Sequence, residues 1–269
     1  MSHRPRKRFG QNFLHDPGVI RRITEAIAPR PGEAMVEIGP GQGALTCELL
    51  PRLGRLDVVE LDRDLIRPLA ERCGSLGELR IHQADALKFD FRPLAPGPHA
   101  LRVVGNLPYN ISTPLLFHLI DQIEIIRDMH FMLQKEVVER LVARPGSHAW
   151  GRLAIMVQYH CATEMLFTVG PGAFRPAPKV ESAVVRLVPH DTPPVDVDAA
   201  RLKRVVAQAF AHRRKTLRNN LRGLLEPEAI AALGIDPGLR PERLTLEQFA
   251  ALARALDGQE RGSGDEGQG

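Results

Sequence analysis

The segment Val36-Glu37-Ile38-Gly39-Pro40-Gly41-Gln42-Gly43-Ala44 decides the fold, because it leads from an apolar β-like run through a glycine-rich turn into a helical stretch. Around it, residues 32–135 alternate short β-like runs with helical stretches, a pattern typical of βαβ units and a parallel sheet. We predict strands at Ala34–Ile38, Leu56–Leu61, Leu79–Gln83, Leu101–Val104 and Met129–Leu133, and helices at Ala44–Arg52, Asp64–Arg72 and Thr113–Asp121. The β-rich runs Glu164–Val169 and Ala183–Val188 have no helical pattern between them, so we expect them to pair antiparallel.

The chain changes character after about Pro189. The polar, proline-containing stretch HDTPPVDVD leads into residues with helical composition and no strand signal. One helical face carries apolar residues at suitable spacing, namely Leu202, Val205, Val206, Ala209 and Phe210, and Pro241–Leu256 is expected to form a further helix. The expected fold is therefore an α/β sheet domain at 1–190, a small all-helical domain at 195–257 and a disordered tail at 258–269.

Composition places the chain among ordinary globular proteins. Its 269 residues correspond to about two domains, and 43% hydrophobic with 25% charged residues supply a sizeable core and exclude wholesale disorder. No run approaches the roughly 18 apolar residues that a bilayer-crossing helix needs, and the basic N-terminus lacks the apolar stretch of a secretory signal. Cys47, Cys73 and Cys161 lie far apart, which fits neither a disulfide framework nor a zinc site. We therefore expect a soluble, reduced, cytoplasmic protein.

Positive charge is concentrated in two blocks. Residues 1–10 contain four Lys/Arg and residues 201–222 contain eight, with no acid in either block. After Gly223 the balance reverses, with nine acids against four arginines. Two basic blocks followed by an acidic tail indicate a polyanionic partner, although solvated helix faces give the same pattern.

The glycine-rich turn has three readings when it is taken alone. It matches E-x-G-x-G-x-G, which is usual in S-adenosylmethionine-dependent methyltransferases, and it also matches the dinucleotide fingerprint G-x-G-x-x-[GA] that ends at Ala44. A tight turn without a ligand is the third reading. In the first two, glycine lets the backbone approach the ligand closely, and the following helix offers N–H groups that have no partner.

Two acids follow the next two predicted strands. Glu60 ends the second strand, where its carboxylate can accept hydrogen bonds from both hydroxyls of a ribose. Asp85 follows the third strand, where its carboxylate can accept a hydrogen bond from an adenine amino group. Ligands of open α/β sheets bind at this edge, so the acids predict a nucleoside-containing cofactor, either S-adenosylmethionine or NAD.

The choice between S-adenosylmethionine and NAD depends on the next motif, Gly105-Asn106-Leu107-Pro108-Tyr109-Asn110-Ile111-Ser112. Asn-Leu-Pro-Tyr resembles the [DNS]-P-P-[YFW] signature of enzymes that methylate exocyclic amino groups of bases. The Asn106 side-chain oxygen and the Leu107 carbonyl can accept the two N6–H bonds of adenine, whose lone pair is otherwise delocalised into the ring. Pro108 fixes the turn, and Tyr109 offers a face on which an extruded base can stack. The alternative interpretation is a purely structural Asx/Pro turn whose tyrosine packs against the protein and takes no part in catalysis.

At this point the chain resembles the ribosomal RNA adenine dimethyltransferases over nearly its whole length, most closely the bacterial small-subunit (16S) enzymes of the KsgA type. The matching stretches are RKRFGQNFLHD (6–16), VEIGPGQGALT (36–46), VELDRDL (59–65), ADAL (84–87), VGNLPYNIST (104–113), FMLQKEVVERL (131–141), FRPAPKVESAVVRL (174–187) and AFAHRRKTLRNNL (209–221). The resemblance implies a Rossmann-like methyltransferase sheet, S-adenosylmethionine as cofactor and a basic N-terminal lid at 1–16.

The resemblance also assigns roles to residues. It implies that the cofactor is bound by Asn12, Leu14, Gly39, Gly41, Glu60, Asp85 and Asn106. It places Tyr109 against one face of the target base and Phe174 against the other. From the sequence alone Phe174 is either a core residue or an exposed aromatic in a proline-rich loop, beside Arg175 and Lys179, which suit RNA phosphates.

Basic residues also gather in the stretch AHRRKTLRNNL of the helical domain. We expect phosphate contacts to structured RNA from Arg213, Arg214, Lys215, Arg218 and Arg222. The ten histidines show no metal-binding spacing, so no metal is expected.

The resulting hypothesis is an enzyme that transfers methyl groups from S-adenosylmethionine to N6 of two adjacent adenosines in the 3′-terminal hairpin of 16S rRNA. It implies an immature small ribosomal subunit as partner, a role in subunit biogenesis, a monomer and no membrane association. Three alternatives remain: a large-subunit rRNA methyltransferase of the antibiotic-resistance type, a non-enzymatic assembly factor and a NAD dehydrogenase.

Overall fold

The computed structural model describes residues 12–212 and 214–262. These residues divide into two compact units: the first comprises the chain up to Glu139 with Cys161–Pro189, and the second comprises Arg140–His160 with the chain from His190 onward. This division places residues 140–160 with the second unit, whereas the sequence analysis placed residues 1–190 in one domain. No helix in the described ranges is long and apolar enough to cross a membrane.

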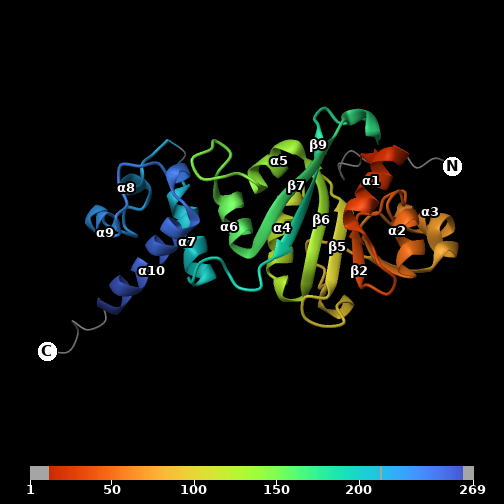
Figure 1. The fold of residues 1–269 in the computed structure, drawn as a ribbon, viewed down its shortest axis with the longest axis horizontal. Helices are drawn as coiled ribbons and strands as arrows, with labels where there is room; N and C mark the ends of the chain where they lie inside the picture. The colour runs from red at the N-terminus through yellow and green to blue at the C-terminus, as the bar shows by residue number, and fades with distance from the viewer. Residues whose placement is uncertain (1–11, 213, 263–269) are drawn as a thin grey trace. The chain divides into compact units, whose positions relative to one another are not determined.

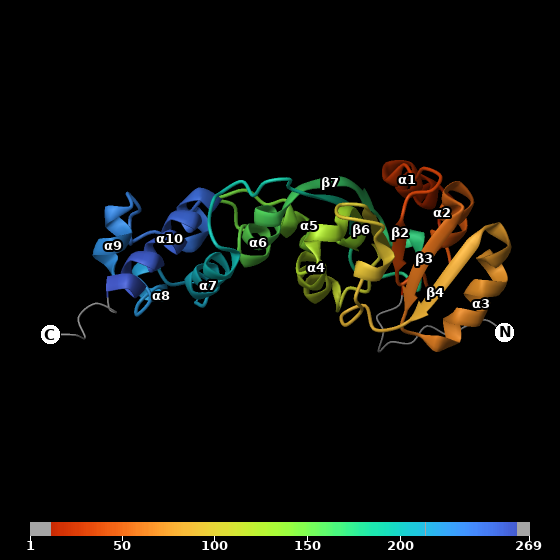
Figure 2. The same cartoon turned by 90° about the horizontal axis from the view of Figure 1, so that it is seen from below.

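The first unit is built on a seven-stranded sheet of order β4-β3-β2-β5-β6-β9-β7 (Figures 1 and 2). Its strands are β2 (Met35–Ile38), β3 (Arg55–Glu60), β4 (Glu78–Gln83), β5 (Leu101–Asn106), β6 (Ile126–Gln134), β7 (Cys161–Val169) and β9 (Ser182–Pro189). The first five are parallel, whereas β9 is antiparallel to both β6 and β7. The prediction of a mostly parallel sheet with one antiparallel hairpin is confirmed.

Among the described residues, five helices accompany the strands of this sheet, and three of them lie in connections between parallel strands. They are α1 (Pro17–Ile27), α2 (Thr46–Leu53), α3 (Arg63–Cys73), α4 (Ser112–Ile120) and α5 (Lys135–Leu141), whose last two residues already fall in the second unit. Local sequence explains where they start: Asp16 caps α1 by accepting a hydrogen bond from Val19 N at 2.9 Å, and Asp62 caps α3. Buried Leu49, Leu50 and Leu69 then join α2 and α3 to the sheet's core.

A second, two-stranded sheet was not predicted. β1 (Phe13–Leu14) pairs antiparallel with β8 (Phe174–Arg175), with Leu14 opposite Phe174. The start of the described chain is thereby joined to the loop before β9, about 160 residues later.

The second unit is helical. Its helices are α6 (Arg152–His160), α7 (Ala199–Ala209), α8 (Leu217–Asn220), α9 (Pro227–Ala232) and α10 (Leu246–Gly262). The apolar face predicted for α7 is buried, with Phe210 half-buried beyond the helix end. Two expectations are wrong. Pro241–Leu256 is not one helix, because Pro241–Arg243 forms a 3₁₀ turn before α10, and α10 runs past the expected tail boundary at 258.

Candidate active site

A cavity of about 340 Å³ opens at the carboxyl edge of the parallel strands. β3 lies on one side of β2 and β5 on the other, so this edge contains the switch point of the sheet, where ligands of α/β proteins bind. The cavity is lined by Asn12–Leu14, by residues 37–42, 44 and 45, by Ala84–Leu87 and Asn106–Ile111, and by residues around Glu60. Its volume lies in the range of roughly 300–1,000 Å³ that is usual for small-molecule sites.

The glycine-rich turn supplies one wall. Gly39 and Gly41 have φ angles of 67° and 57°, in the left-handed region that side chains rarely adopt. A Cβ atom on Gly41 would lie 3.1 Å from the Phe13 ring, and one on Gly39 would lie 3.9 Å from Pro108 Cδ. The turn is therefore packed closely between the N-terminal segment and the Asn-Leu-Pro-Tyr turn.

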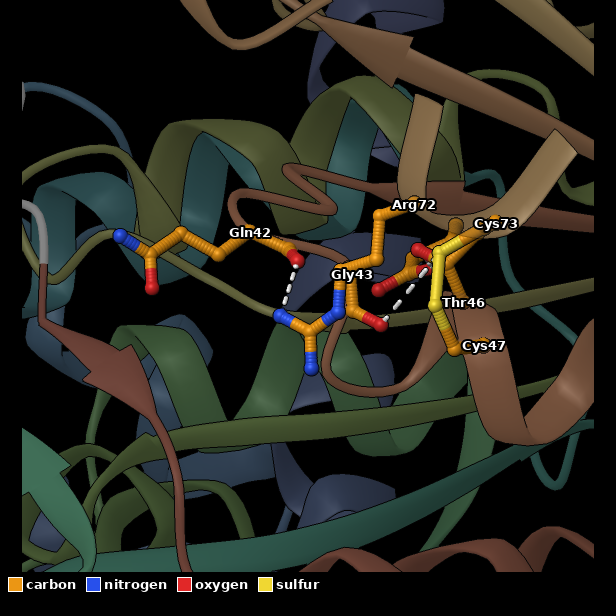
Figure 3. The surroundings of a disulfide bond; sticks show 7 residues. Gln42, Gly43, Thr46, Cys47, Arg72 and Cys73 are labelled. Carbon is orange, nitrogen blue, oxygen red and sulfur yellow. Dashed lines mark hydrogen bonds between the residues drawn. A yellow bond between two sulfur atoms is a disulfide. The ribbon is translucent and has the colours of Figure 1, made fainter. Parts of the chain in front are cut away.

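The third glycine of the turn, Gly43, lies against a disulfide bond. This bond contradicts the expectation that the cysteines are too far apart to form a disulfide framework. Cys47 on α2 is bonded to Cys73 at the end of α3 (Figure 3). A Cβ atom on Gly43 would meet the Cys73 sulfur at 2.8 Å. Arg72 Nη1 donates to the Gln42 carbonyl at 2.8 Å (Figure 3), so the end of α3 is joined to the turn by this hydrogen bond and by the contact between Cys73 and Gly43. Sequence separation could not reveal this pair, because the fold brings α2 and α3 together.

Glu60 connects the end of β3 to the turn. Its carboxylate is 6% exposed and accepts hydrogen bonds from Gly41 N at 3.2 Å and from Asp62 N at 2.8 Å. Burial raises the pKa of Glu60, and these N–H donors oppose that shift. Asp85, which also lines the cavity, is half-buried and accepts a hydrogen bond from Leu87 N at 3.0 Å.

Glu37 is a further acid beneath the turn. It is 1% exposed, and Thr46 Oγ1 donates a 2.6 Å hydrogen bond to its Oε2 atom. Burial raises the pKa of Glu37 to about 7, and the nearby Glu60 carboxylate contributes to the rise. In the sequence Glu37 is visible only as part of the motif, and nothing there marks Thr46 as its partner.

These residues fit S-adenosylmethionine. The cofactor has a ribose with two hydroxyls and an adenine with an amino group, and the cavity brings two carboxylates that can accept hydrogen bonds from them, Glu60 and Asp85, to one glycine-lined space. All seven residues predicted to bind the cofactor line this cavity. Asn106 and Tyr109, which are predicted to act on the base, line it as well.

The Asn106 amide has a defined orientation. Its Nδ2 atom donates a 3.1 Å hydrogen bond to the Asn12 carbonyl. Within the described ranges, no protein donor reaches Asn106 Oδ1 or the Leu107 carbonyl. Two acceptors are therefore available beside the cavity, as the activation of an N6 amino group requires.

Tyr109 is half-buried and lines the cavity mouth. Its hydroxyl lies 2.7 Å from the Ser182 hydroxyl, and Ser112 Oγ donates to its carbonyl at 3.1 Å. Burial raises the pKa of Tyr109, and the Ser182 hydrogen bond opposes the rise. Ser182 was missed in the sequence analysis, since it lies 73 residues away from Tyr109.

Phe174 is not the exposed aromatic that was considered. Its side chain is 2% exposed and belongs to the apolar core together with Leu14, opposite which it lies in the β1–β8 ladder. It is absent from the described residues that line the cavity. Arg175 and Lys179, by contrast, are exposed, as expected.

The basic stretch of the second unit is also exposed. This holds for Arg214, Lys215, Arg218 and Arg222, whereas Arg213 lies outside the described residues. The buried Asn220, another residue missed from sequence, donates from Nδ2 to the carbonyls of Ala209, His212 and Lys215 at 2.6, 3.2 and 3.4 Å. Asn220 thereby fixes the turn that carries the basic side chains.

Comparison with known proteins identifies the family. The model of the family described as ribosomal RNA adenine dimethylase matches residues 2–257. Proteins named ribosomal RNA small subunit methyltransferase A are 60% identical to this chain in Pseudomonas putida (96% of this chain, 97% of the relative) and in Nitrosococcus oceani (94% and 97%).

Solved structures agree with this match. A dimethyladenosine transferase from Plasmodium falciparum has a TM-score of 0.78 at 25% identity, covering 92% of this chain and 98% of its own. The 23S rRNA methyltransferase ErmE has a TM-score of 0.72 at 27% identity, covering 91% and 100%. The chain belongs to the ribosomal RNA adenine dimethylase family and is an S-adenosylmethionine-dependent rRNA adenine dimethyltransferase.

Proposed function

We propose that the protein transfers methyl groups from S-adenosylmethionine to N6 of two adjacent adenosines in the 3′-terminal hairpin of 16S rRNA. The observation that carries the proposal is that Asn106–Tyr109 form one wall of the cavity whose other wall is the glycine-rich turn with Glu60. A donor of methyl groups and an adenine amino group can therefore meet in one space. Relatives at 60% identity, which are named for the small ribosomal subunit, support the choice of RNA.

The residues of the site explain how the amino group is activated. S-adenosylmethionine supplies an electrophilic methyl group. Asn106 Oδ1 and the Leu107 carbonyl accept the two N6–H bonds, which draws the nitrogen lone pair out of the ring and toward the methyl group. Stacking of the extruded base on Tyr109 is worth roughly 1–3 kcal/mol. Methylation makes N6 more acidic, so its proton can leave to solvent, and orientation supplies the rest of the catalysis.

We further propose that the substrate is an immature small subunit in the cytoplasm, bound by a monomer. The exposed cations Arg214, Lys215, Arg218 and Arg222 support contacts with RNA phosphates, since no acid lies among them in the sequence. Arg175 and Lys179, in the loop before β9, are proposed to bind the phosphates near the target base.

Primer extension on small-subunit RNA tests this function. N6-dimethyladenine blocks the Watson–Crick edge, so reverse transcriptase should stop at the two adenosines in wild-type cells and read through in cells that lack the gene. The wild-type gene should restore the stops. Asn106→Ala should fail to restore them, because loss of one well-placed polar contact to the reacting centre lowers the rate by roughly 10²–10³.

The same cells also distinguish the large-subunit alternative. Stops that depend on the gene but lie in large-subunit RNA would favour an enzyme of the ErmE type, with which the chain shares its fold. Identical stops with and without the gene, in both RNAs, would refute the proposed activity and favour a non-enzymatic assembly factor.

A further inference from the structure

Ser182 lies directly behind the tyrosine of the base-binding turn. Its Oγ atom is 2.7 Å from the Tyr109 hydroxyl, and its side chain is 0% exposed. A buried hydroxyl needs a partner, because an unsatisfied one costs about 1–3 kcal/mol. Ser182 and Tyr109 are therefore partners within the first unit, on elements that are far apart in the sequence.

Ser182 is held rigidly on both sides. It is the first residue of β9, where it pairs with Gln134 of β6 and with Val169 of β7. Just before it, Lys135 N donates to the Glu181 carbonyl at 3.0 Å, and Lys135 Nζ lies 2.8 Å from the Glu181 carboxylate. The Ser182 hydroxyl is thus a fixed point of the sheet.

Tyr109, in contrast, lies in a turn. Its segment connects β5 to α4, and Tyr109 is half-buried and lines the cavity. Ser112 Oγ donates to its carbonyl, which is a contact of the backbone and does not set the direction of the side chain. The hydrogen bond at the far end of the ring, to Ser182, fixes the direction in which the side chain points from the backbone.

We propose that Ser182 is a positioning residue for methyl transfer, whose hydroxyl holds the Tyr109 ring in the orientation on which the target adenine stacks. The inference rests on the proposed function, because it concerns the same base-binding site. Ser182 does not touch the substrate in this scheme. It acts through Tyr109, and the sheet's antiparallel end thereby supports the reaction that takes place at its parallel edge.

A double-mutant cycle tests the coupling. Ser182→Ala removes one hydroxyl of the pair, and Tyr109→Phe removes the other but keeps the ring. Each single change is expected to lower kcat about three- to tenfold, which corresponds to a net hydrogen bond of roughly 0.5–1.5 kcal/mol. The double variant should be no slower than the singles, because both remove one shared interaction. The dissociation constant for S-adenosylmethionine should not change.

A second readout does not depend on turnover. A hairpin RNA with 2-aminopurine at the target position reports stacking, because stacking on tyrosine quenches its fluorescence. We expect quenching by the wild type, less by Ser182→Ala, and recovery with Ser182→Thr, which keeps a hydroxyl. Thr24→Val is a matched control, since Thr24 is also a buried hydroxyl but donates to Ile20 O within α1, and its quenching should equal that of the wild type.

The outcomes separate the two proposals. Additive losses in the cycle, or normal quenching and kcat in a Ser182→Ala protein that has only a lower melting temperature, would overturn the positioning role. If Ser182→Ala does not fold, Tyr109→Phe with undiminished quenching and kcat overturns it as well. A wild-type protein that makes no N6-dimethyladenine in 16S rRNA would instead overturn the proposed function, whatever the variants do.

Discussion

Replacement of Gly43 by alanine should damage both the fold and the cofactor site, whereas the same change at Gly54 should damage only the fold. The two glycines have nearly equal φ angles, 81° and 82°, and lie at opposite ends of the segment that contains α2. Their surroundings differ. A Cβ atom on Gly43 would lie 2.8 Å from both Cys73 Sγ and Leu69 Cδ1, but one on Gly54 would have no atom within 4 Å.

These contacts set the expected magnitudes. The left-handed backbone costs alanine roughly 1–2 kcal/mol at either site. At Gly43 overpacking adds roughly 1–3 kcal/mol, because Leu69 is 1% exposed and Cys73 is tied to Cys47, so neither neighbour has room to move. Gly43→Ala should therefore lower the free energy of unfolding by about 2–5 kcal/mol and Gly54→Ala by about 1–2 kcal/mol.

Urea unfolding and calorimetry measure the two effects. The denaturation midpoint should fall further for Gly43→Ala than for Gly54→Ala. The affinity of Gly43→Ala for S-adenosylmethionine should fall about tenfold, which corresponds to a loss of roughly 1.4 kcal/mol in binding free energy, because the glycine-rich turn is displaced. Gly54→Ala should keep the wild-type affinity. Equal losses of stability in the two variants, together with unchanged affinity at Gly43, would refute the idea that the disulfide and Leu69 support the turn.

Three further changes remove charged or titratable side chains. Glu60→Ala should weaken S-adenosylmethionine binding by roughly 2–3 kcal/mol, because the ribose loses a charged acceptor; unchanged affinity by calorimetry would place the ribose elsewhere. Replacing Arg213, Arg214 and Lys215 by alanine should flatten the slope of log RNA affinity against log salt by up to about 2–3 and spare cofactor binding; a wild-type slope in a folded protein would exclude phosphate contacts. Glu37→Gln should change the pH dependence of unfolding. The pKa of Glu37 is about 7 in the folded protein and takes its ordinary value of 4.5 in the unfolded chain. Between pH 4.5 and about 7 the folded protein therefore keeps the proton and the unfolded chain loses it, so the free energy of unfolding falls as the pH rises through this range. Urea midpoints at pH 5 and pH 8 should differ less in Glu37→Gln than in the wild type, and an equal difference would contradict the assignment.

Local sequence was enough to locate the cofactor cavity. The glycine-rich turn, Glu60 and Asp85 each lie at or just after the end of a short β-like run that is visible in the sequence, and parallel strands bring their carboxyl ends to one edge. Asn106 and Tyr109 were found for the same reason, since the chemistry of the turn is contained in four consecutive residues. These features needed no knowledge of tertiary contacts.

Contacts between distant segments were beyond the sequence. The Tyr109–Ser182 pair, the Cys47–Cys73 bond and the pairing of Leu14 with Phe174 each depend on how separate elements meet. Phe174 shows the problem, because a phenylalanine in a proline-rich loop has the same local sequence whether it faces solvent or the core. Residues 140–160, for which no element was predicted, belong to the second unit, and local sequence does not tell with which unit a segment packs.

The pairing of β1 with β8 has a kinetic consequence. The short N-terminal segment packs Phe13 against Gly41, orients the Asn106 amide through the Asn12 carbonyl and pairs with the loop before β9. An outward movement of this segment would therefore release the Asn106 amide and expose the glycine-rich turn at the same time. Exchange of the cofactor by this route would interrupt the orientation of Asn106 at each turnover.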